Sequence, residues 1–416
     1  MHPTDYTITT FNNGITLVSE QLPHVQSFSI GMWFSTGSRD ETKANNGISH
    51  FIEHMLFKGT TKRSARRISE ETESLGGYIN AFTTKEHTCF YGRGLQQHIG
   101  KTFEVLSDMI LNPAFRQKDI NNEQRIIIDE LNDILDTPEE MIFEEFEEKL
   151  FNCKGVGLTI MGTEKSILSF TENQLREYYT KTYLSRPLLI VCSGNIEHNR
   201  LVDLTAKYLN GYKSGRSKKT APATVGDFFN TELISKVEQT YCIIGNSSVG
   251  MTDINRYRLM VLSGILGDGT SSRLFQNIRE KMGISYQIQS FINFFSDISV
   301  FGVFFSTSEE NYAKALAATH KEIEKLLVAP IGNKELKRAK EYLKGSFLLG
   351  LESTNSRMNR LANSLLYFGR VQESSEMIQE IDSITAEEIL QTAKEFFTDS
   401  LSQIVIKPRK QTESVA

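Results

Sequence analysis

The sequence predicts an α+β protein made of two homologous domains that arose by internal duplication. Each domain is expected to hold a mainly antiparallel sheet covered by helices. The length of 416 residues with 39% hydrophobic content suits two cores of about 200 residues each. Residues 212–230 have a linker composition, and the order of strands and helices after them repeats the order before them. The predicted domain boundaries are therefore 1–211 and 231–416.

Residues 7–10 and 15–19 are expected to be strands joined by a turn at Asn12-Asn13-Gly14. In the next strand, residues 27–34, apolar residues alternate and mark one buried face. A buried strand at 188–194 is also expected. Helices are predicted at 65–75, 97–111, 118–135, from 138, at 172–183 and at 198–209.

The stretches 78–84 and 86–92 mix polar and apolar residues, which suggests a hairpin near a sheet edge. Such an edge could pair with an extended peptide, and Asn80, Ala81, Phe82 and Thr83 are the candidate peptide-binding residues. An ordinary paired strand is the alternative. His87 is expected to be a strand surface residue rather than a metal ligand.

Residues 50–54 read His-Phe-Ile-Glu-His, within a mostly apolar helix predicted at 47–57. At about 100° per residue, His50, Glu53 and His54 share one face. Two imidazoles one turn apart can bind one metal ion, and the carboxylate can reach a water on that ion. The order H-x-x-E-H is the inverted zinc-hydrolase motif. A chance match is the alternative, but three buried polar groups without partners would be costly unless they serve a metal.

The helix at 118–135 supplies a candidate third ligand. Glu123 and Glu130 differ by only about 20° around the axis, whereas Asp129 lies about 100° from Glu130. Two histidines and one carboxylate are a recurring catalytic zinc set, so Glu130 is the expected ligand and Glu123 its support. Two glutamates on a helix usually form a solvated face, but neighbours such as Ile126 and Ile127 favour burial.

The second half repeats this order, with strands at 240–245, 285–295 and 298–306 and helices at 255–266, 272–281, 310–327 and from 333. Aligning the halves puts Tyr342 opposite Glu130, and the helix equivalent to the motif helix has no histidine. We expect the second copy to lack a metal site and to serve in packing or in holding substrate.

A net charge of −5 with 23% charged residues predicts no nucleic-acid partner. The four cysteines are scattered and form no C-x-x-C pair, which indicates a reducing compartment. No apolar run reaches the roughly 18 residues that span a bilayer. The first six residues resemble neither a signal nor a transit peptide, so the expected location is the cytoplasm, without a membrane partner.

The chain resembles, nearly end to end, the zinc peptidases of the pitrilysin and mitochondrial-processing-peptidase family, in its short bacterial branch. The resemblance is carried by Gly37-Ser38-Arg39, residues 50–54 with Phe57-Lys58-Gly59-Thr60, Gly76-Gly77, Asn80-Ala81, Glu123 with Glu130, Asp136-Thr137-Pro138, Gly162-Thr163 and residues 271–276.

The resemblance implies that His50, His54 and Glu130 bind one Zn²⁺ per chain and that Glu53 is the general base. It implies that Arg279 and Tyr286 contact the substrate or the oxyanion; a solvated arginine and a core tyrosine are the alternative. It also implies that each chain forms half of a clamshell around a closed chamber, with unfolded peptides as substrates and a homodimer as the assembly.

The expected function is a zinc metalloendopeptidase in which Glu53 acts on a zinc-bound water. One alternative is a non-catalytic scaffold or partner subunit of the same fold, against which the intact ligand set argues. A zinc amidase acting on small molecules is the other, and the duplicated architecture with its sheet edge makes the peptidase preferable.

Overall fold

The computed structural model describes residues 6–215, 221–397 and 400–409, and it divides into two compact units. Unit 1 comprises Met1–Asn132, Lys154–Ala221 and Leu348–Glu373; unit 2 comprises Asp133–Cys153, Pro222–Phe347 and Ser374–Ala416. Each unit thus takes one segment from the other half of the sequence. The predicted domains, 1–211 and 231–416, are each one continuous segment and do not include this exchange. Residues 216–220 of the predicted linker lie outside the described residues.

Unit 1 is built on a six-stranded sheet in the order β1-β2-β6-β3-β5-β4. The strands are β1 (Tyr6–Thr10), β2 (Ile15–Gln21), β3 (Ser27–Phe34), β4 (Tyr78–Thr83), β5 (Thr88–Leu95) and β6 (Leu188–Gly194). Neighbouring strands are antiparallel except β2 and β6, which run parallel with Ile15 opposite Leu188. The prediction of a mainly antiparallel sheet is confirmed for this unit.

Helices cover both faces of this sheet. The helices of unit 1 are α1 (Ile48–Phe57), α2 (Ala65–Glu73), α3 (Ile99–Leu111), α4 (Gln117–Asp136), whose last residues belong to unit 2, α6 (Glu164–Ser169), α7 (Glu172–Tyr178), α8 (His198–Tyr208) and α12 (Thr354–Phe368). The predicted helix at 172–183 is split, because a π-helical turn, Tyr179–Leu184, follows α7.

The predicted alternation in β3 is confirmed. Phe28 and Phe34 join the core that includes Phe51 of α1. On the opposite face, Trp33 packs with Met358 of α12 in a separate apolar cluster. Since side chains alternate across a strand, one sheet buries two apolar layers and α12 supplies the second cover.

Unit 2 contains a five-stranded sheet in the order β7-β11-β8-β10-β9. The strands are β7 (Asn230–Ser235), β8 (Thr240–Val249), β9 (Gln287–Phe294), β10 (Ile298–Thr307) and β11 (Ser402–Pro408). The helices are α5 (Pro138–Leu150), α9 (Arg256–Leu266), α10 (Tyr312–Val328), α11 (Asn333–Gly350), α13 (Ser374–Ser383) and α14 (Ala386–Phe397), and a π-helical turn spans Phe275–Lys281. Here too the one parallel pair, β7 with β11, is followed by antiparallel pairs.

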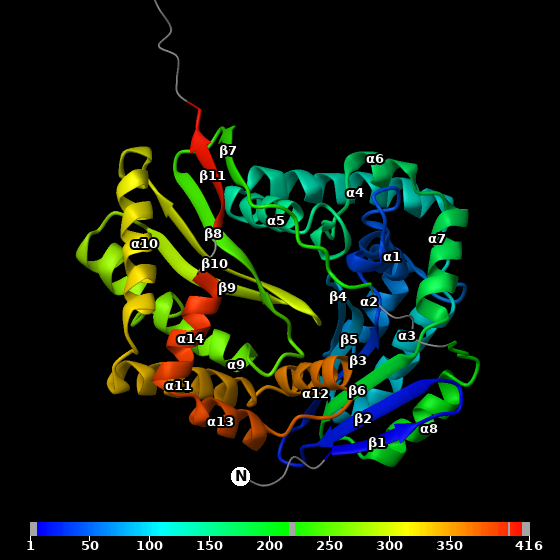
Figure 1. Ribbon diagram of the computed structural model, residues 1–416. Helices are drawn as coiled ribbons and strands as arrows, with labels where there is room; N and C mark the ends of the chain where they lie inside the picture. The colour runs from blue at the N-terminus through cyan, green and yellow to red at the C-terminus, as the bar shows by residue number, and fades with distance from the viewer. Residues whose placement is uncertain (1–5, 216–220, 398–399, 410–416) are drawn as a thin grey trace, which may run out of the picture. The chain divides into compact units, whose positions relative to one another are not determined.

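The two sheets have the same topology once β1 is set aside. Strands β2-β6-β3-β5-β4 match β7-β11-β8-β10-β9 in order, and the parallel pair occupies the same place in both. The exchanged helices are also equivalent: α5 follows α4 and packs on β8 and β11, whereas α12 follows α11 and packs on β3 and β6 (Figure 1). The predicted duplication is confirmed, and it includes β7 and β11, which the sequence reading did not identify.

Candidate functional site

Helix α1 carries the histidine–glutamate motif in unit 1. Its apolar residues, including Phe51 and Ile52, are fully buried and fix the helix against the sheet. His50, Glu53 and His54 therefore occupy the remaining face, as the helical period requires. The imidazole rings of His50 and His54 lie with their centroids 4.6 Å apart.

Helix α4 brings a carboxylate to these two rings. One ligand atom each from His50, His54 and Glu130 lies within 4.8 Å of the others, and His54 Nε2 is 3.4 Å from Glu130 Oε2. No second group of this kind occurs in the described part of the chain. Asp129 is exposed on another face of the helix, as expected from the helical period.

The donor set fits a divalent metal ion. Burial, together with the neighbouring His54, lowers the pKa of His50 to about 3, so its imidazole is neutral at neutral pH with a lone pair to donate. Burial alone would lower the pKa of His54, but the hydrogen bond to Glu123 and the nearby carboxylates outweigh it and the pKa is raised. Two imidazoles and a carboxylate that leave the rest of the coordination sphere open are typical of catalytic zinc sites.

Glu123 lies behind His54, on the side away from Glu130. Its Oε2 is 3.1 Å from His54 Nδ1, and its Oε1 is 2.7 Å from the Nζ of Lys58. Burial would raise the pKa of Glu123, but the bonds to His54 and Lys58 lower it below its usual value. In the neutral tautomer with its proton on Nδ1, His54 donates a hydrogen bond to Glu123. Its Nε2 lone pair then lies on the side of Glu130.

The expected burial of both glutamates is only half right. Glu123 is buried, but the side chain of Glu130 is 42% exposed. Ile127 is buried beneath the helix, whereas Ile126 is exposed. The outward position of Glu130 leaves the ligand cluster reachable from one side.

Glu53 faces the end of strand β4. The hydroxyl of Thr83 donates a hydrogen bond to Glu53 Oε2. Burial raises the pKa of Glu53, and the bond from Thr83 and the nearby His54 only partly oppose this. A carboxylate with a raised pKa, next to a cluster of metal ligands, is suited to accept and return a proton.

Strand β4 is an edge of the unit 1 sheet, as predicted, since in the described sheet it pairs with β5 alone. Ala81 and Thr83 point to the α1 side, where Ala81 joins the core. Asn80 and Phe82 lie on the other face by strand alternation. His87, predicted as a strand surface residue, instead lies in the β4–β5 turn with its ring 5.3 Å from that of Tyr367, because the turn folds back under α12.

In unit 2, Arg279 and Tyr286 form a stacked pair. The guanidinium of Arg279 lies 5.8 Å from the ring centroid of Tyr286 and 4.7 Å from that of Phe275. Tyr286 is 75% exposed, so the alternative of a core tyrosine is wrong. Both side chains are accessible to a ligand.

The position equivalent to the metal site is filled differently in unit 2. Glu335, which aligns with Glu123, forms two 2.8 Å hydrogen bonds to Arg273. Tyr342, which aligns with Glu130, lies 3.5 Å from Asp268. An ion pair thus stands at the position of Glu123, and a tyrosine hydroxyl stands at the position of Glu130.

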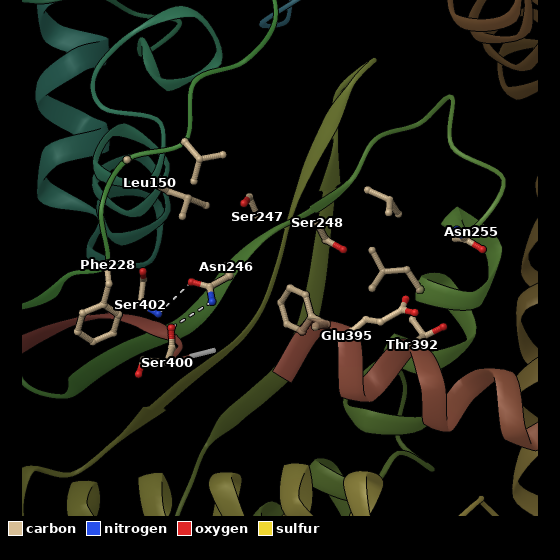
Figure 2. Close-up of a pocket in the computed structure, with 15 residues that line it drawn as sticks. Leu150, Phe228, Asn246, Ser247, Ser248, Asn255, Thr392, Glu395, Ser400 and Ser402 are labelled. Carbon is tan, nitrogen blue, oxygen red and sulfur yellow. Dashed lines mark hydrogen bonds between the residues drawn. The ribbon is translucent and has the colours of Figure 1, made fainter. Parts of the chain in front are cut away.

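Unit 2 also contains a cavity of about 600 Å³ between the end of β8, the ends of α5 and α14 and the start of α9. Figure 2 shows the Asn246 side chain, which lines the cavity, hydrogen-bonded to the backbone of Ser400 and Ser402. Its lining includes hydroxyl groups and one carboxylate, Glu395, but no predicted site residue.

Three contacts at the site were not predicted: the bond from Thr83 to Glu53, the pairing of Lys58 with Glu123, and the hydrogen bonds of Glu41 to the start of α1. Lys58 directly follows the motif helix, one turn after His54, and that spacing was a usable signal. No helix or strand period signals the other two, since each joins two separate elements.

Comparisons with known proteins give the family of this chain. Residues 16–164 match the family model described as insulinase (peptidase family M16), and residues 169–343 match the peptidase M16 inactive domain. A Bacillus subtilis protein named as a zinc protease, YmxG, is 33% identical over 96% of this chain and 97% of its own length. A Streptomyces coelicolor protein, also named as a zinc protease, is 34% identical over 98% of this chain and 90% of its own.

Two solved structures share the fold. A protease from Helicobacter pylori superposes with a TM-score of 0.89 at 21% identity, covering 98% of this chain and 100% of its own. A Pseudomonas fluorescens structure described as a peptidase M16 inactive domain has a TM-score of 0.89 at 17% identity. The match covers 97% of this chain and 98% of that structure's chain. The chain belongs to peptidase family M16, as the sequence resemblance implied, and it is a metallopeptidase. Among its described helices, none combines the length and apolar character needed to cross a bilayer.

Proposed function

We propose that this protein is a zinc metalloendopeptidase that cleaves unfolded peptides or protein segments inside a closed chamber. The observation that carries the proposal is the approach of His50, His54 and Glu130 to within 4.8 Å, with Glu53 on the same helix face as the histidines. The names of the bacterial relatives as zinc proteases support zinc as the metal. The proposed stoichiometry is one Zn²⁺ per chain.

His50, His54 and Glu130 would hold the ion, with Glu123 and Lys58 orienting His54. When bound, zinc lowers the pKa of a water and polarises the scissile carbonyl. Glu53 takes a proton from the attacking water on its carboxylate and delivers it to the nitrogen of the leaving amine. The hydroxyl of Thr83 holds one oxygen of Glu53, which leaves the other oxygen to carry the proton.

The open edge of β4 supports the assignment of peptide as substrate. An extended chain can add to this edge through backbone hydrogen bonds, which makes binding tolerant of side-chain sequence. Asn80, Ala81, Phe82 and Thr83 are the proposed contacts. A folded domain cannot offer an extended strand there, so unfolded substrates are favoured.

We also propose that the protein acts as a homodimer in which Arg279 and Tyr286 of one chain stabilise the oxyanion at the metal site of the other. Their stacked, exposed arrangement supports a ligand-binding role. Mixing Glu53→Gln and Tyr286→Phe chains tests this. Completion between chains should restore about half the activity per mixed dimer, since one of the two sites is then intact. No recovery, or an active monomer by mass measurement, would refute the dimer model.

The deciding experiment for the enzymatic function is metal analysis combined with cleavage of a mixed peptide library. The expected result is about one zinc ion per chain and cleavage that a chelator abolishes and zinc restores. A protein that binds zinc but cuts no peptide in the library would favour the non-catalytic scaffold. Cleavage of small amides alone would favour the amidase.

A further inference from the structure

Residues 37–41 (Gly-Ser-Arg-Asp-Glu) lie between two elements of the candidate site, and we call them the bridging segment. The segment follows β3 and contains a 3₁₀ turn, Ser38–Asp40. Ser38, Arg39 and Glu41 are buried although all three are polar. Burying polar groups is costly unless they are hydrogen-bonded, so their bonds identify what the segment holds.

At one end, Glu41 binds the first turn of α1. Its Oε2 accepts hydrogen bonds from the backbone N–H of Gly47 (2.7 Å) and from the side chain of Asn46 (2.9 Å), and its Oε1 accepts one from the N–H of Ser49 (2.8 Å). The first N–H groups of a helix have no partner within it, and Gly47, at the N-cap with φ of 91°, has no side chain to serve them. Glu41 therefore caps, from outside, the helix turn in which His50 lies.

At the other end, the segment binds the residues that follow β4. The N–H of Ser38 donates to Thr84 O (3.3 Å), and the N–H of Arg39 donates to Lys85 O (2.8 Å). The guanidinium of Arg39 also pairs with Glu86 at 2.7 Å. A side chain on Gly37 would place its Cβ 2.2 Å from Thr84 O, so this approach requires glycine.

These contacts join α1 and the end of β4 in two ways, one through Glu53 and one through the bridging segment. Glu53 of α1 bonds to Thr83 at the end of β4, and the bridging segment joins the start of α1 to the next residues, Thr84 and Lys85. We propose that Glu41 is a positioning residue: through the bridging segment it holds α1 in register with the edge strand, so that His50 and Glu53 keep their places relative to a peptide on β4. This inference rests on the proposed peptidase function.

Glu41→Gln is the test substitution. It keeps the size of the side chain, but its NH₂ group replaces an oxygen that accepts from a backbone N–H, so at least one of the three bonds becomes a donor–donor clash. Glu20→Gln is the matched control. Glu20 is also buried (2% exposed, against 7% for Glu41) and also bonded, to Arg357 at 2.7 Å and to Ser193 at 3.1 Å, but it lies on β2.

Three measurements on the 416-residue chain test the proposal: amide hydrogen exchange, zinc affinity by chelator competition, and peptide cleavage at saturating zinc. In Glu41→Gln, exchange should rise in residues 47–53 and 83–86 and not elsewhere, zinc affinity should fall at least severalfold, and kcat should fall at least about tenfold. Glu20→Gln should keep wild-type zinc affinity and kcat even where its melting temperature falls as much.

Wild-type local exchange and zinc affinity in Glu41→Gln would overturn the proposal, as would equal losses of kcat in the two variants. If Glu41→Gln does not fold, Glu41→Asp replaces it, because it keeps the charge but shortens the reach by one methylene; wild-type values there would overturn the proposal as well. A wild-type chain that cleaves no peptide would contradict the proposed function alone. The exchange and zinc measurements would still decide the role of Glu41.

Discussion

Replacing Glu123 by glutamine should weaken zinc binding while unit 1 stays folded. The carboxylate is buried and lies 3.1 Å from His54 Nδ1 and 2.7 Å from Lys58 Nζ. Its lowered pKa keeps it ionised at neutral pH. Glutamine has nearly the same shape, but it loses the charge that holds the Nδ1 proton and turns an NH₂ group toward one of two donors.

The size of the effect follows from this position behind a ligand. Losing the hydrogen-bond partner of a metal-bound histidine typically costs about 10–100-fold in metal affinity, or about 1.4–2.7 kcal/mol. Because water reaches little of the Glu123 carboxylate, a loss in the upper half of that range is expected.

Competition with a chelator of known affinity, near neutral pH, measures this loss directly. Asp129→Asn is the control, since Asp129 lies on the same helix and is exposed. Wild-type zinc affinity in Glu123→Gln, or equal losses in both variants, would refute the reasoning that His54 depends on its buried partner.

Four further outcomes are expected. Glu53→Gln should keep zinc and lose at least about a hundredfold in turnover, since only the base is removed; an active, zinc-loaded variant would contradict its role. Glu130→Gln should weaken zinc binding and Asp129→Asn should not, so equal losses in titrations would mean that the wrong acid was chosen. Flexible peptides should be cut while a compact folded protein survives, and rapid cleavage at an ordered internal site would count against the chamber. Burial lowers the pKa of His87 in the folded chain below 6.5. As the pH falls through about 6.5, the unfolded chain therefore binds a proton at this residue before the folded chain does, and the free energy of unfolding decreases. Between thermal melts at pH 7 and pH 5, His87→Phe should lose less stability than the wild type, and equal losses would argue against this.

Several features could be predicted from the sequence because they depend on residues close together in the chain. A helix repeats every 3.6 residues, so the shared face of His50, Glu53 and His54 and the separation of Glu130 from Asp129 follow from spacing alone. A strand repeats every two residues, and the buried face of β3 follows equally directly. The edge position of β4 was indicated by its mixed polarity.

Other features were decided only by the tertiary structure, because they join residues that no local period relates. Strand β11 pairs in parallel with β7, with Gln403 opposite Asn230, and α5 and α12 each pack on a sheet built from the other half of the sequence. Glu41 reaches the start of α1 across the turn at residues 43–47, a contact that no helix or strand period predicts, and Thr83 meets Glu53 only because β4 ends beside α1. The sequence alone thus determined the candidate ligands and base as residues that share a helix face, and the duplicated plan, since each follows from local spacing or internal repetition. Long-range packing decided that Glu123 supports His54 and that Thr83 supports Glu53, since such contacts form only after distant segments have been brought together.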